Sequence, residues 1–365
     1  MHFPYLRCYI KKYFSVMKVS IIVIFLSSSE LVHIAWQCTY KCNLKCIHCY
    51  AAYNPRKTLT NKQAKNLIKQ ASDLGTKSFV FTGGEPLLRN DILELARFAR
   101  DLGMTPVIAT NATLMTPDHI ESFKESKASI AINLPTLVEE THVKFTRIPS
   151  SLSKKMMALN ALLKEGLSVS VGAVVTSVNI DDVEGVIRFA ESQGLTCDAL
   201  AIIPMGRAKS EILPKLHSYK NLMTRLFDEW HALPMNAIGY KGFSKVSVYE
   251  PSYSALMSSK GFEVPGRLCS LSQTMHVMED GSVRPCPYIP YSLGNVMKNG
   301  LKDLWRRLKK DRFLQGLCDV DRVKGKCSKC SFKEVCGGCR ARAYWMFGDY
   351  FAEDKVCILD RVSDS

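Results

Sequence analysis

Three cysteines lie in one short segment near the start of the chain, spaced as Cys42-x3-Cys46-x2-Cys49. Cysteine thiolates bind iron-sulfur clusters, and a 4Fe-4S cluster normally takes four of them. Three thiolates in one loop therefore predict a cluster with one iron left open to a ligand other than protein. We expect the chemistry of the protein to take place at that open iron.

A second motif follows, Gly83-Gly84-Glu85-Pro86, after an apolar segment. Two glycines without Cβ atoms let the backbone approach a ligand closely. The glutamate can accept a hydrogen bond from a ligand ammonium group or brace the turn, and the proline stiffens it. We predict that this motif binds a cofactor beside the cluster.

Cys38 provides an alternative, because it lies four residues before Cys42. Four thiolates can form a closed tetrahedral zinc site, and the spacing does not exclude one. However, Cys38 ends a predicted strand, and a zinc site leaves the glycine-glutamate motif without a role. The open iron-sulfur cluster is therefore the favoured interpretation.

A second group of cysteines lies in the last third of the chain. Two C-x2-C pairs are separated there by five residues, whereas those of a zinc ribbon are normally ~15 to 20 residues apart. The spacing favours auxiliary iron-sulfur clusters over zinc. Cys318 is a possible extra ligand, and Cys8 and Cys197 are expected to be small apolar residues. The predicted ligands are Cys269, Cys286, Cys327, Cys330, Cys336, Cys339 and Cys357.

The composition places these motifs in a large globular protein. The 365 residues include 14 cysteines, and their clustering predicts metal binding in a reducing compartment, hence a cytoplasmic protein. The net charge of +15 permits an anionic substrate, nucleic acid or a membrane surface as partner. The apolar run 19–26 is far shorter than the ~18 residues that span a bilayer, so no membrane span is expected.

Short apolar runs alternate with amphipathic ones from about residue 31, which predicts six βα units around a parallel sheet. The expected fold is a partial αβ barrel, TIM-like, followed by a small cysteine-rich domain. We predict strands at 31–37, 78–82, 105–110, 129–133, 168–175 and 199–203, and helices near 60–74, 91–102, 117–126, 150–165, 181–193 and 217–230. The predicted divisions are an extension over 1–30, the barrel over 31–235, a linker over 236–265 and the last domain over 266–365.

The motifs fall where predicted strands end. The cysteine loop follows the first strand, the glycine-glutamate motif the second, Asn111 the third and Asn133 the fourth. Because loops at the carboxyl ends of parallel strands build the active site in such folds, these segments are expected to share one pocket.

The two N-terminal motifs together resemble the radical S-adenosylmethionine superfamily. The resemblance implies that S-adenosylmethionine binds the open iron and is cleaved to a 5′-deoxyadenosyl radical, which abstracts hydrogen from substrate. It implies a reduced ferredoxin or flavodoxin-type protein as electron donor. It makes Cys42, Cys46 and Cys49 the ligands and places His48 near the adenine. The cofactor-binding residues would be Gly83, Gly84, Glu85, Pro86, Asn111 and Asn133, although both asparagines can equally be local turn caps.

The C-terminal cysteines resemble the SPASM extension of the same superfamily, which holds one or two auxiliary 4Fe-4S clusters. The resemblance assigns Cys327, Cys330, Cys336 and Cys357 to one cluster, and Cys269, Cys286 and Cys339 to another with an unidentified fourth ligand. The family usually has three residues between the last two cysteines of the central block, and this chain has two. That departure leaves the partition of ligands open.

The string from Cys336 to Tyr344 looks most like the branch that acts in anaerobic heme and modified-heme biosynthesis. Such enzymes remove carboxylated side-chain fragments from an iron tetrapyrrole, which suits a basic protein. Arg207, Arg340 and Arg342 can bind carboxylates bidentately, but surface solvation is the simpler expectation for Arg340 and Arg342.

Two other hypotheses remain. The segment Asn133-Leu-Pro-Thr136 stands where the heme branch commonly has a Ser-Leu-Asp-Gly-like turn, so the chain can instead be a peptide, protein or cofactor maturase. The third hypothesis is a noncatalytic iron-sulfur or zinc module that binds nucleic acid. No interleaved aromatic and basic repeat supports it, and we expect no nucleic-acid partner.

Overall fold

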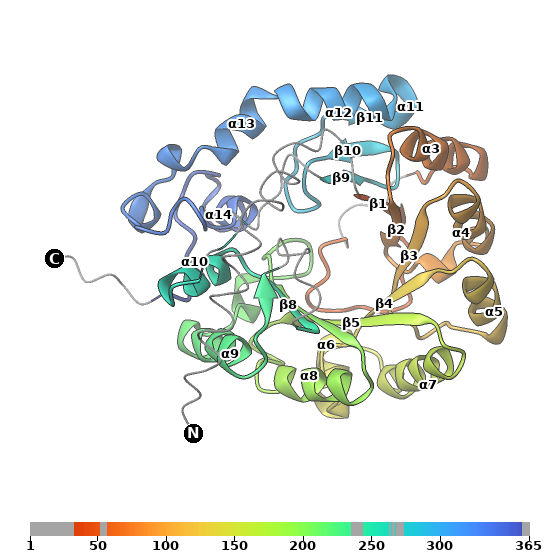
Figure 1. The fold of residues 1–365 in the computed structure, drawn as a ribbon, viewed down its shortest axis with the longest axis horizontal. Helices are drawn as coiled ribbons and strands as arrows, with labels where there is room; N and C mark the ends of the chain where they lie inside the picture. The colour runs from red at the N-terminus through yellow and green to blue at the C-terminus, as the bar shows by residue number, and fades with distance from the viewer. Residues whose placement is uncertain are drawn as a thin grey trace.

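The computed structural model describes residues 33–51, 57–234, 244–262, 264, 267 and 274–359. The predicted extension and two of the cysteines, Cys8 and Cys269, lie outside these residues. The described chain forms one eleven-stranded sheet in the order β11-β10-β9-β1-β2-β3-β4-β5-β6-β8-β7. The sheet curves into an incomplete barrel with helices around its outside (Figure 1). The predicted α/β class is therefore confirmed.

All six predicted strands are present, although β6 begins and ends earlier than expected. All strands from β1 to β8 that pair with one another do so in parallel, and the antiparallel pairs lie at the β9, β10 and β11 end. The strands are β1 (His33–Thr39), β2 (Ser78–Gly83), β3 (Thr105–Thr110), β4 (Ser129–Asn133), β5 (Ser168–Val175), β6 (Thr196–Ala201), β7 (Leu233–Pro234), β8 (Val246–Tyr249), β9 (Thr274–Val277), β10 (Ser282–Arg284) and β11 (Gly294–Asn295).

The six predicted helices are also present, and a further helix, α6, precedes α7. Among the helices in the described part of the chain, none combines the length and the apolar composition that a bilayer span needs. The helices are α3 (Asn61–Asp73), α4 (Ile92–Asp101), α5 (Pro117–Glu125), α6 (Glu139–Thr146), α7 (Ser151–Lys164), α8 (Val183–Ser192), α9 (Leu216–Asp228), α10 (Pro251–Ser259), α11 (Val296–Asn299), α12 (Leu301–Lys310), α13 (Arg312–Cys318) and α14 (Arg340–Phe347).

Alternating side chains explain how the strands and helices pack. Trp36, Phe79 and Phe81 are completely buried and contact one another on the helix-facing side of β1 and β2. The apolar faces of α3 and α4 complete this core with residues such as Leu67 and Leu95. Burial of large side chains at these positions drives the folding of each βα unit, at about 1.5–3 kcal/mol per side chain.

The C-terminal cysteine-rich segment is joined to the barrel through the sheet itself. β9 pairs in parallel with β1, with His33 opposite Thr274 and Trp36 opposite Val277. The segment predicted as a linker, 236–265, contains β8 and α10, and β8 pairs with β6 and β7 in the sheet. The division of the chain into a barrel and a last domain stays a prediction.

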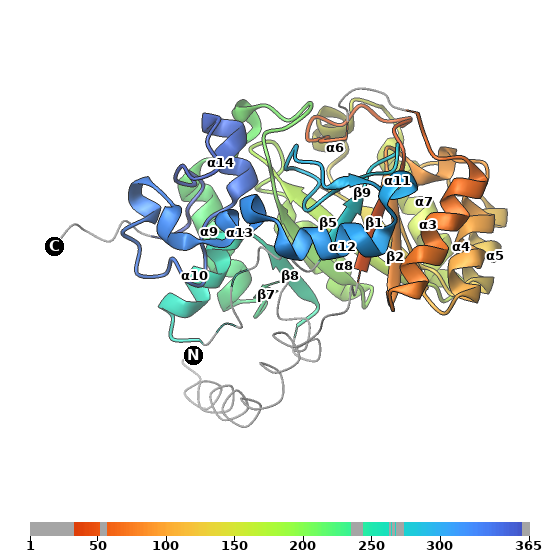
Figure 2. The same ribbon diagram turned by 90° about the horizontal axis from the view of Figure 1, so that it is seen from above.

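The last helix closes the open side of the barrel. In Figure 1, α12 and α13 run from the β11 end of the sheet toward α14, and Figure 2 shows α12, α13 and α14 in the same order from above. Arg342 of α14 donates to both carboxylate oxygens of Glu250, the N-cap of α10, at 2.9 Å each. It also binds Asp354 through Nε and Nη2 at 2.8 and 2.7 Å. One buried guanidinium therefore connects the C-terminal segment to the far end of the sheet.

The surface solvation expected for Arg340 and Arg342 is wrong. Arg340 is 3% exposed and Arg342 is completely buried. Their side chains bind groups of the protein itself, because the Arg342 carboxylate partners come from α10 and from the segment after α14. Neither arginine is an exposed site for a substrate carboxylate.

We predict that Arg342→Met will strongly destabilise the fold. The substitution leaves two buried carboxylates without their cation, and breaking a buried ion pair in this way costs about 3–5 kcal/mol. The measurement is the free energy of unfolding from anaerobic denaturant titration followed by circular dichroism.

The matched control for this prediction is Arg306→Gln. Arg306 pairs with Asp303 on the surface, where the two side chains are 64% and 62% exposed. Removal of an exposed pair should change the stability by less than about 1 kcal/mol. Equal losses in the two variants would contradict the role given to Arg342.

Candidate active site

The cysteine loop leaves β1 at the top of the barrel and is held by two other segments. Lys45 and Ile47 donate backbone hydrogen bonds to the carbonyl oxygens of Thr146 and Phe145 at the end of α6, at 3.1 and 2.9 Å. Arg207, in the loop after β6, donates from its backbone N–H to the Cys49 carbonyl at 3.0 Å and from Nε to the Cys46 carbonyl at 2.9 Å. Loops after β4 and β6 thus fix the loop after β1, as expected for strand exits that share one pocket.

The two glycines of the second motif lie directly against the start of this loop. Gly84 donates to the Thr39 carbonyl and Glu85 to the Lys41 carbonyl, both at 2.7 Å. A Cβ on Gly83 would lie 2.3 Å from the Thr39 carbonyl oxygen, and one on Gly84 would lie 2.0 Å from that of Lys41. We expected the glycines to admit a ligand. In the structure, the close neighbour that requires them is the backbone that leads into the cysteines.

Glu85 braces the motif from inside. Its side chain is completely buried and accepts hydrogen bonds from Thr110 Oγ1 at 2.6 Å, the Asn111 backbone at 2.8 Å and the Leu87 backbone at 3.1 Å. Burial raises the pKa of this carboxyl, and the three donors oppose the shift. Of the two roles expected for Glu85, the structure shows the structural one, which also connects the exits of β2 and β3.

Lys155 is a buried cation that the sequence analysis missed. It is completely buried in α7, its ammonium donates to the Asn133 carbonyl, and burial lowers its pKa to about 8, against the raising effects of Cys46 and Glu85. A signal was available, because Lys155 falls between Leu152 and Leu159 at helical spacing on the apolar face of its helix. Lysine is almost never fully buried unless it is paired, so a lysine on the apolar face of a helix stands out.

His48 lies beneath the loop with its ring against Phe145, at 4.6 Å between ring centroids. Burial lowers its pKa to about 3, with smaller contributions from Lys155 and Arg207, so the imidazole is neutral. Its Nδ1 is buried and has no hydrogen-bond partner in the described part of the chain. An unpartnered ring nitrogen beside the cysteine loop is available to a cofactor.

The two asparagines lie at the exits of β3 and β4. The Asn111 side chain donates to Asn43 Oδ1 at 3.0 Å and lies 3.9 Å from the Cys42 sulfur. Asn133 Nδ2 is 3.4 Å from the Gly172 carbonyl. Asn111 is therefore part of the cysteine site. The Asn133 carbonyl instead accepts from Lys155, and its side chain points to the neighbouring strand β5.

Cys38 lies apart from the other cysteines of the loop. It is completely buried in the core under β1, and burial raises its pKa to about 12. Within the described residues, no group of three or more histidine, cysteine, aspartate and glutamate side chains converges on a position for a single metal ion. Zinc holds its sulfur ligands at about 2.3 Å from one centre, so the position of Cys38 in the core does not suit the four-thiolate zinc alternative.

The C-terminal cysteines fall into two neighbourhoods. Burial raises the pKa of Cys286, and the nearby Cys339 thiolate raises it further. In the same way, the Cys357 thiolate raises the pKa of Cys336, and the Cys327 thiolate raises the pKa of Cys357. The partition of these cysteines between two clusters stays a prediction.

An aromatic pair lies between the N-terminal and C-terminal cysteines. Tyr50, next to Cys49, packs edge-to-face on Tyr288 at 5.0 Å between ring centroids. Burial raises the pKa of Tyr50 to about 12, and the thiolates of Cys49 and Cys286 on either side raise it further. The two cysteine systems are therefore neighbours, separated by these two rings.

Comparison with known proteins identifies this arrangement. Residues 36–190 match the Radical SAM superfamily, and residues 269–340 match SPASM, an iron-sulfur cluster-binding domain. The AdoMet-dependent heme synthase of Nitratidesulfovibrio vulgaris is 30% identical over 340 residues, which are 89% of this chain and 91% of that protein. The chain belongs to the radical S-adenosylmethionine superfamily. It is an enzyme, and the hypothesis of a noncatalytic nucleic-acid module is wrong.

Other relatives agree with the expected branch and fold. The AdoMet-dependent heme synthase of Methanosarcina barkeri is 29% identical over 89% of this chain and 95% of its own. Among solved structures, SuiB of Streptococcus suis bound to its precursor peptide SuiA superimposes with a TM-score of 0.72 at 19% identity, over 95% of this chain and 81% of that one. The radical SAM enzyme fold with a SPASM extension is thus shown.

As a radical SAM enzyme, the chain uses a 4Fe-4S cluster and S-adenosylmethionine, and its SPASM domain binds iron and sulfur. Three of the predicted cysteine ligands share a hydrogen-bond pattern that suits iron binding. Backbone N–H groups two residues further on donate to the sulfurs of Cys42 and Cys330 at 3.4 Å and of Cys336 at 3.3 Å. Such donors stabilise a thiolate, which is the form that binds iron.

We predict that Gly84→Ala will displace the cysteine loop and reduce iron binding. The new Cβ meets the Lys41 backbone rather than a flexible side chain. The cysteine loop and the glycine-glutamate motif must therefore move apart, which lowers the free energy of unfolding by about 1–3 kcal/mol. The measurements are the iron content after anaerobic reconstitution and the free energy of unfolding.

Gly185→Ala is the control for this prediction. Gly185 lies in α8 with no atom near its missing Cβ, so alanine should leave iron content unchanged and stabilise the helix by up to about 1 kcal/mol. Full iron content in Gly84→Ala would show that the close approach is not required.

Proposed function

We propose that this enzyme carries out oxidative side-chain modification of an iron tetrapyrrole. S-adenosylmethionine bound at the Cys42, Cys46 and Cys49 cluster supplies the radical that abstracts hydrogen from substrate. The proposal is supported by relatives named heme synthases and by the arrangement of cations around the cysteine loop.

The observation that carries the proposal is the position of Arg207. Its guanidinium is exposed, but its Nε is fixed to the Cys46 carbonyl, so a positive charge is held at the cysteine loop. A guanidinium binds carboxylates through two parallel hydrogen bonds. Arg207 is therefore placed to orient a propionate or acetate group of the macrocycle near the reacting carbon.

Lys155 provides the complementary buried charge. It lies beneath the loop close to Cys46 and Glu85, where a bound cofactor would be shielded from water. We propose that its ammonium binds the carboxylate of S-adenosylmethionine, and that Glu85 and the two glycines shape the neighbouring backbone. His48, neutral and with an unpartnered Nδ1, would lie against the adenine.

The auxiliary clusters complete the proposed reaction. After hydrogen abstraction, loss of a carboxyl or acetate fragment leaves one electron on the substrate. We propose that the auxiliary clusters, which the C-terminal cysteines would hold, would accept it, because Tyr50 and Tyr288 lie between the cysteine loop and these cysteines. An electron acceptor at that position makes the net reaction oxidative.

A peptide substrate is the second candidate. It is supported by the fold shared with a peptide-bound enzyme and by the segment after β4, which departs from the heme branch. The test is anaerobic turnover with S-adenosylmethionine and an iron coproporphyrin-like compound, followed by mass spectrometry. Loss of carboxyl or acetate fragments supports the proposal, and turnover only on a peptide encoded beside the gene would overturn it.

We predict that the two cysteine systems separate functionally. Cys42→Ala should abolish formation of 5′-deoxyadenosine, whereas Cys330→Ala or Cys336→Ala should retain it and lose the product, because only the auxiliary cluster is damaged. Chromatography of the nucleoside and of the product measures both.

Cys197→Ala serves as the control, since Cys197 is buried in β6. It should retain both activities. If the Cys330 and Cys336 variants also lose 5′-deoxyadenosine while their fold stays intact, the proposed division of work is wrong.

A further inference from the structure

Helix α14 carries two buried arginines whose surroundings differ. Arg342 has carboxylate partners on both sides. Arg340, two residues before Arg342 in the same helix, is 3% exposed. Its Nη1 donates to the carbonyl oxygens of Tyr350 and Ala352 at 2.8 and 2.9 Å. Its Nε and Nη2 are buried and have no hydrogen-bond partner in the described part of the chain.

Two unused donors on a buried cation are costly. A buried polar group without a partner costs about 1–3 kcal/mol, and more when it is charged. Because Nη1 is fixed to two carbonyls, the guanidinium cannot turn toward solvent to satisfy the others without losing these bonds. The structure therefore calls for an acceptor at Nε and Nη2 that the described side chains do not provide.

The neighbours of these donors indicate what the acceptor is. Nη2 lies against Gly338, where a Cβ would be only 2.7 Å from it. Gly338 in turn donates its backbone N–H to the Cys336 sulfur. Burial raises the pKa of Cys327, and the positive charge of Arg340 is one of the groups that oppose the shift. Arg340 thus lies among the cysteines assigned to one auxiliary cluster.

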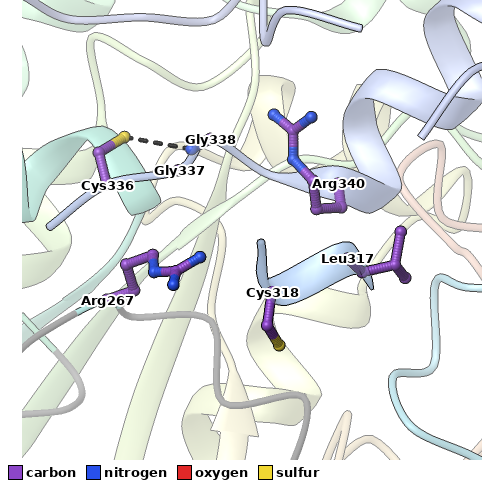
Figure 3. A pocket seen from close by; sticks show the side chains of 7 residues that line it. All are labelled: Arg267, Leu317, Cys318, Cys336, Gly337, Gly338 and Arg340. Atoms are coloured by element: carbon purple, nitrogen blue, oxygen red, sulfur yellow. Dashed lines mark hydrogen bonds between the residues drawn. The ribbon is translucent and has the colours of Figure 1, made fainter. Parts of the chain in front are cut away.

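Figure 3 shows the pocket on this side of the Gly337-Gly338 turn, with the Cys336 sulfur bonded to the Gly338 backbone and Arg340 beyond it. The seven residues that line it include two arginines and two cysteines but no acidic residue. Asp354 lies beside Gly338, but its carboxylate already accepts from Arg342 and from the Cys339 backbone. Among the described residues, a carboxylate is therefore not the acceptor on this side.

We propose that Arg340 donates hydrogen bonds from Nε and Nη2 to a sulfur of the auxiliary iron-sulfur cluster and thereby raises its reduction potential. The inference rests on the ligand set of the proposed function, in which Cys327, Cys330, Cys336 and Cys357 hold this cluster. Reduction adds one electron to the cluster, and a fixed donor cation stabilises the added negative charge. No proton moves, because arginine stays protonated in proteins.

The test uses the full chain with Cys42, Cys46 and Cys49 replaced by alanine, so that only auxiliary clusters remain. The potential is measured by mediated titration with dithionite, followed by electron paramagnetic resonance. In Arg340→Met the equilibrium constant for reduction should fall tenfold or more, which is about 59 mV for one electron. Arg322→Met removes the same charge from an exposed arginine that stacks on Phe351 and should leave the potential unchanged.

The outcomes separate the inference from the proposed function. Iron and sulfide analysis of the parent chain reports on the ligand set, and a parent without auxiliary cluster would refute the proposed function itself. If Arg340→Met contains the full cluster and keeps the parent potential, the role of Arg340 is refuted. An equal shift in Arg322→Met would also refute it, because net charge would then explain the effect.

A second measurement applies where Arg340→Met does not fold or does not bind the cluster. In the parent chain labelled at the arginine nitrogens, the reduced cluster should show a hyperfine coupling to a guanidinium nitrogen. Arg340→Lys keeps the charge and should lose that coupling. A parent chain that shows none would overturn the inference.

Discussion

The central strand β1 is hydrogen-bonded in parallel on both edges, to β2 on one side and to β9 on the other. The position of the active site depends on this double pairing. It places the exit of β1 beside the exit of β2, so that the cysteine loop and the glycine-glutamate motif start from adjacent points. It also brings the segment that follows β9, with the cysteines from Cys286 onward, beside the same loop.

Close backbone contact then converts neighbouring exits into one rigid site. The carbonyls of Thr39 and Lys41 bind the N–H groups of Gly84 and Glu85, and Glu85 continues the connection to β3 through Thr110 and Asn111. The loops after β4 and β6 hold the cysteine loop from the opposite side. Four strand exits therefore limit its motion, which is the pre-organisation that a radical reaction needs to exclude water and side reactions.

Much of this arrangement could be predicted from sequence, because it depends on local patterns. The six strands follow from apolar runs, and the shared pocket follows from motifs at their ends. The rest depends on contacts between distant residues. Glu250 and Arg342 are 92 positions apart, and nothing near either one indicates a partner. β7, β8 and β9 are only two to four residues long and lie beyond the regular alternation, so their place in the sheet is decided by pairing rather than by pattern.

The pairing of β1 with β9 also has a consequence for biosynthesis. The first strand of the barrel finds one of its two partners in the last quarter of the 365-residue chain. Until that segment leaves the ribosome, β1 has an unpaired edge next to the cysteine loop, and such edges are templates for aggregation. Pairing over so long a separation is intrinsically slow. The sheet around the cysteine loop is therefore completed late in the synthesis of the chain.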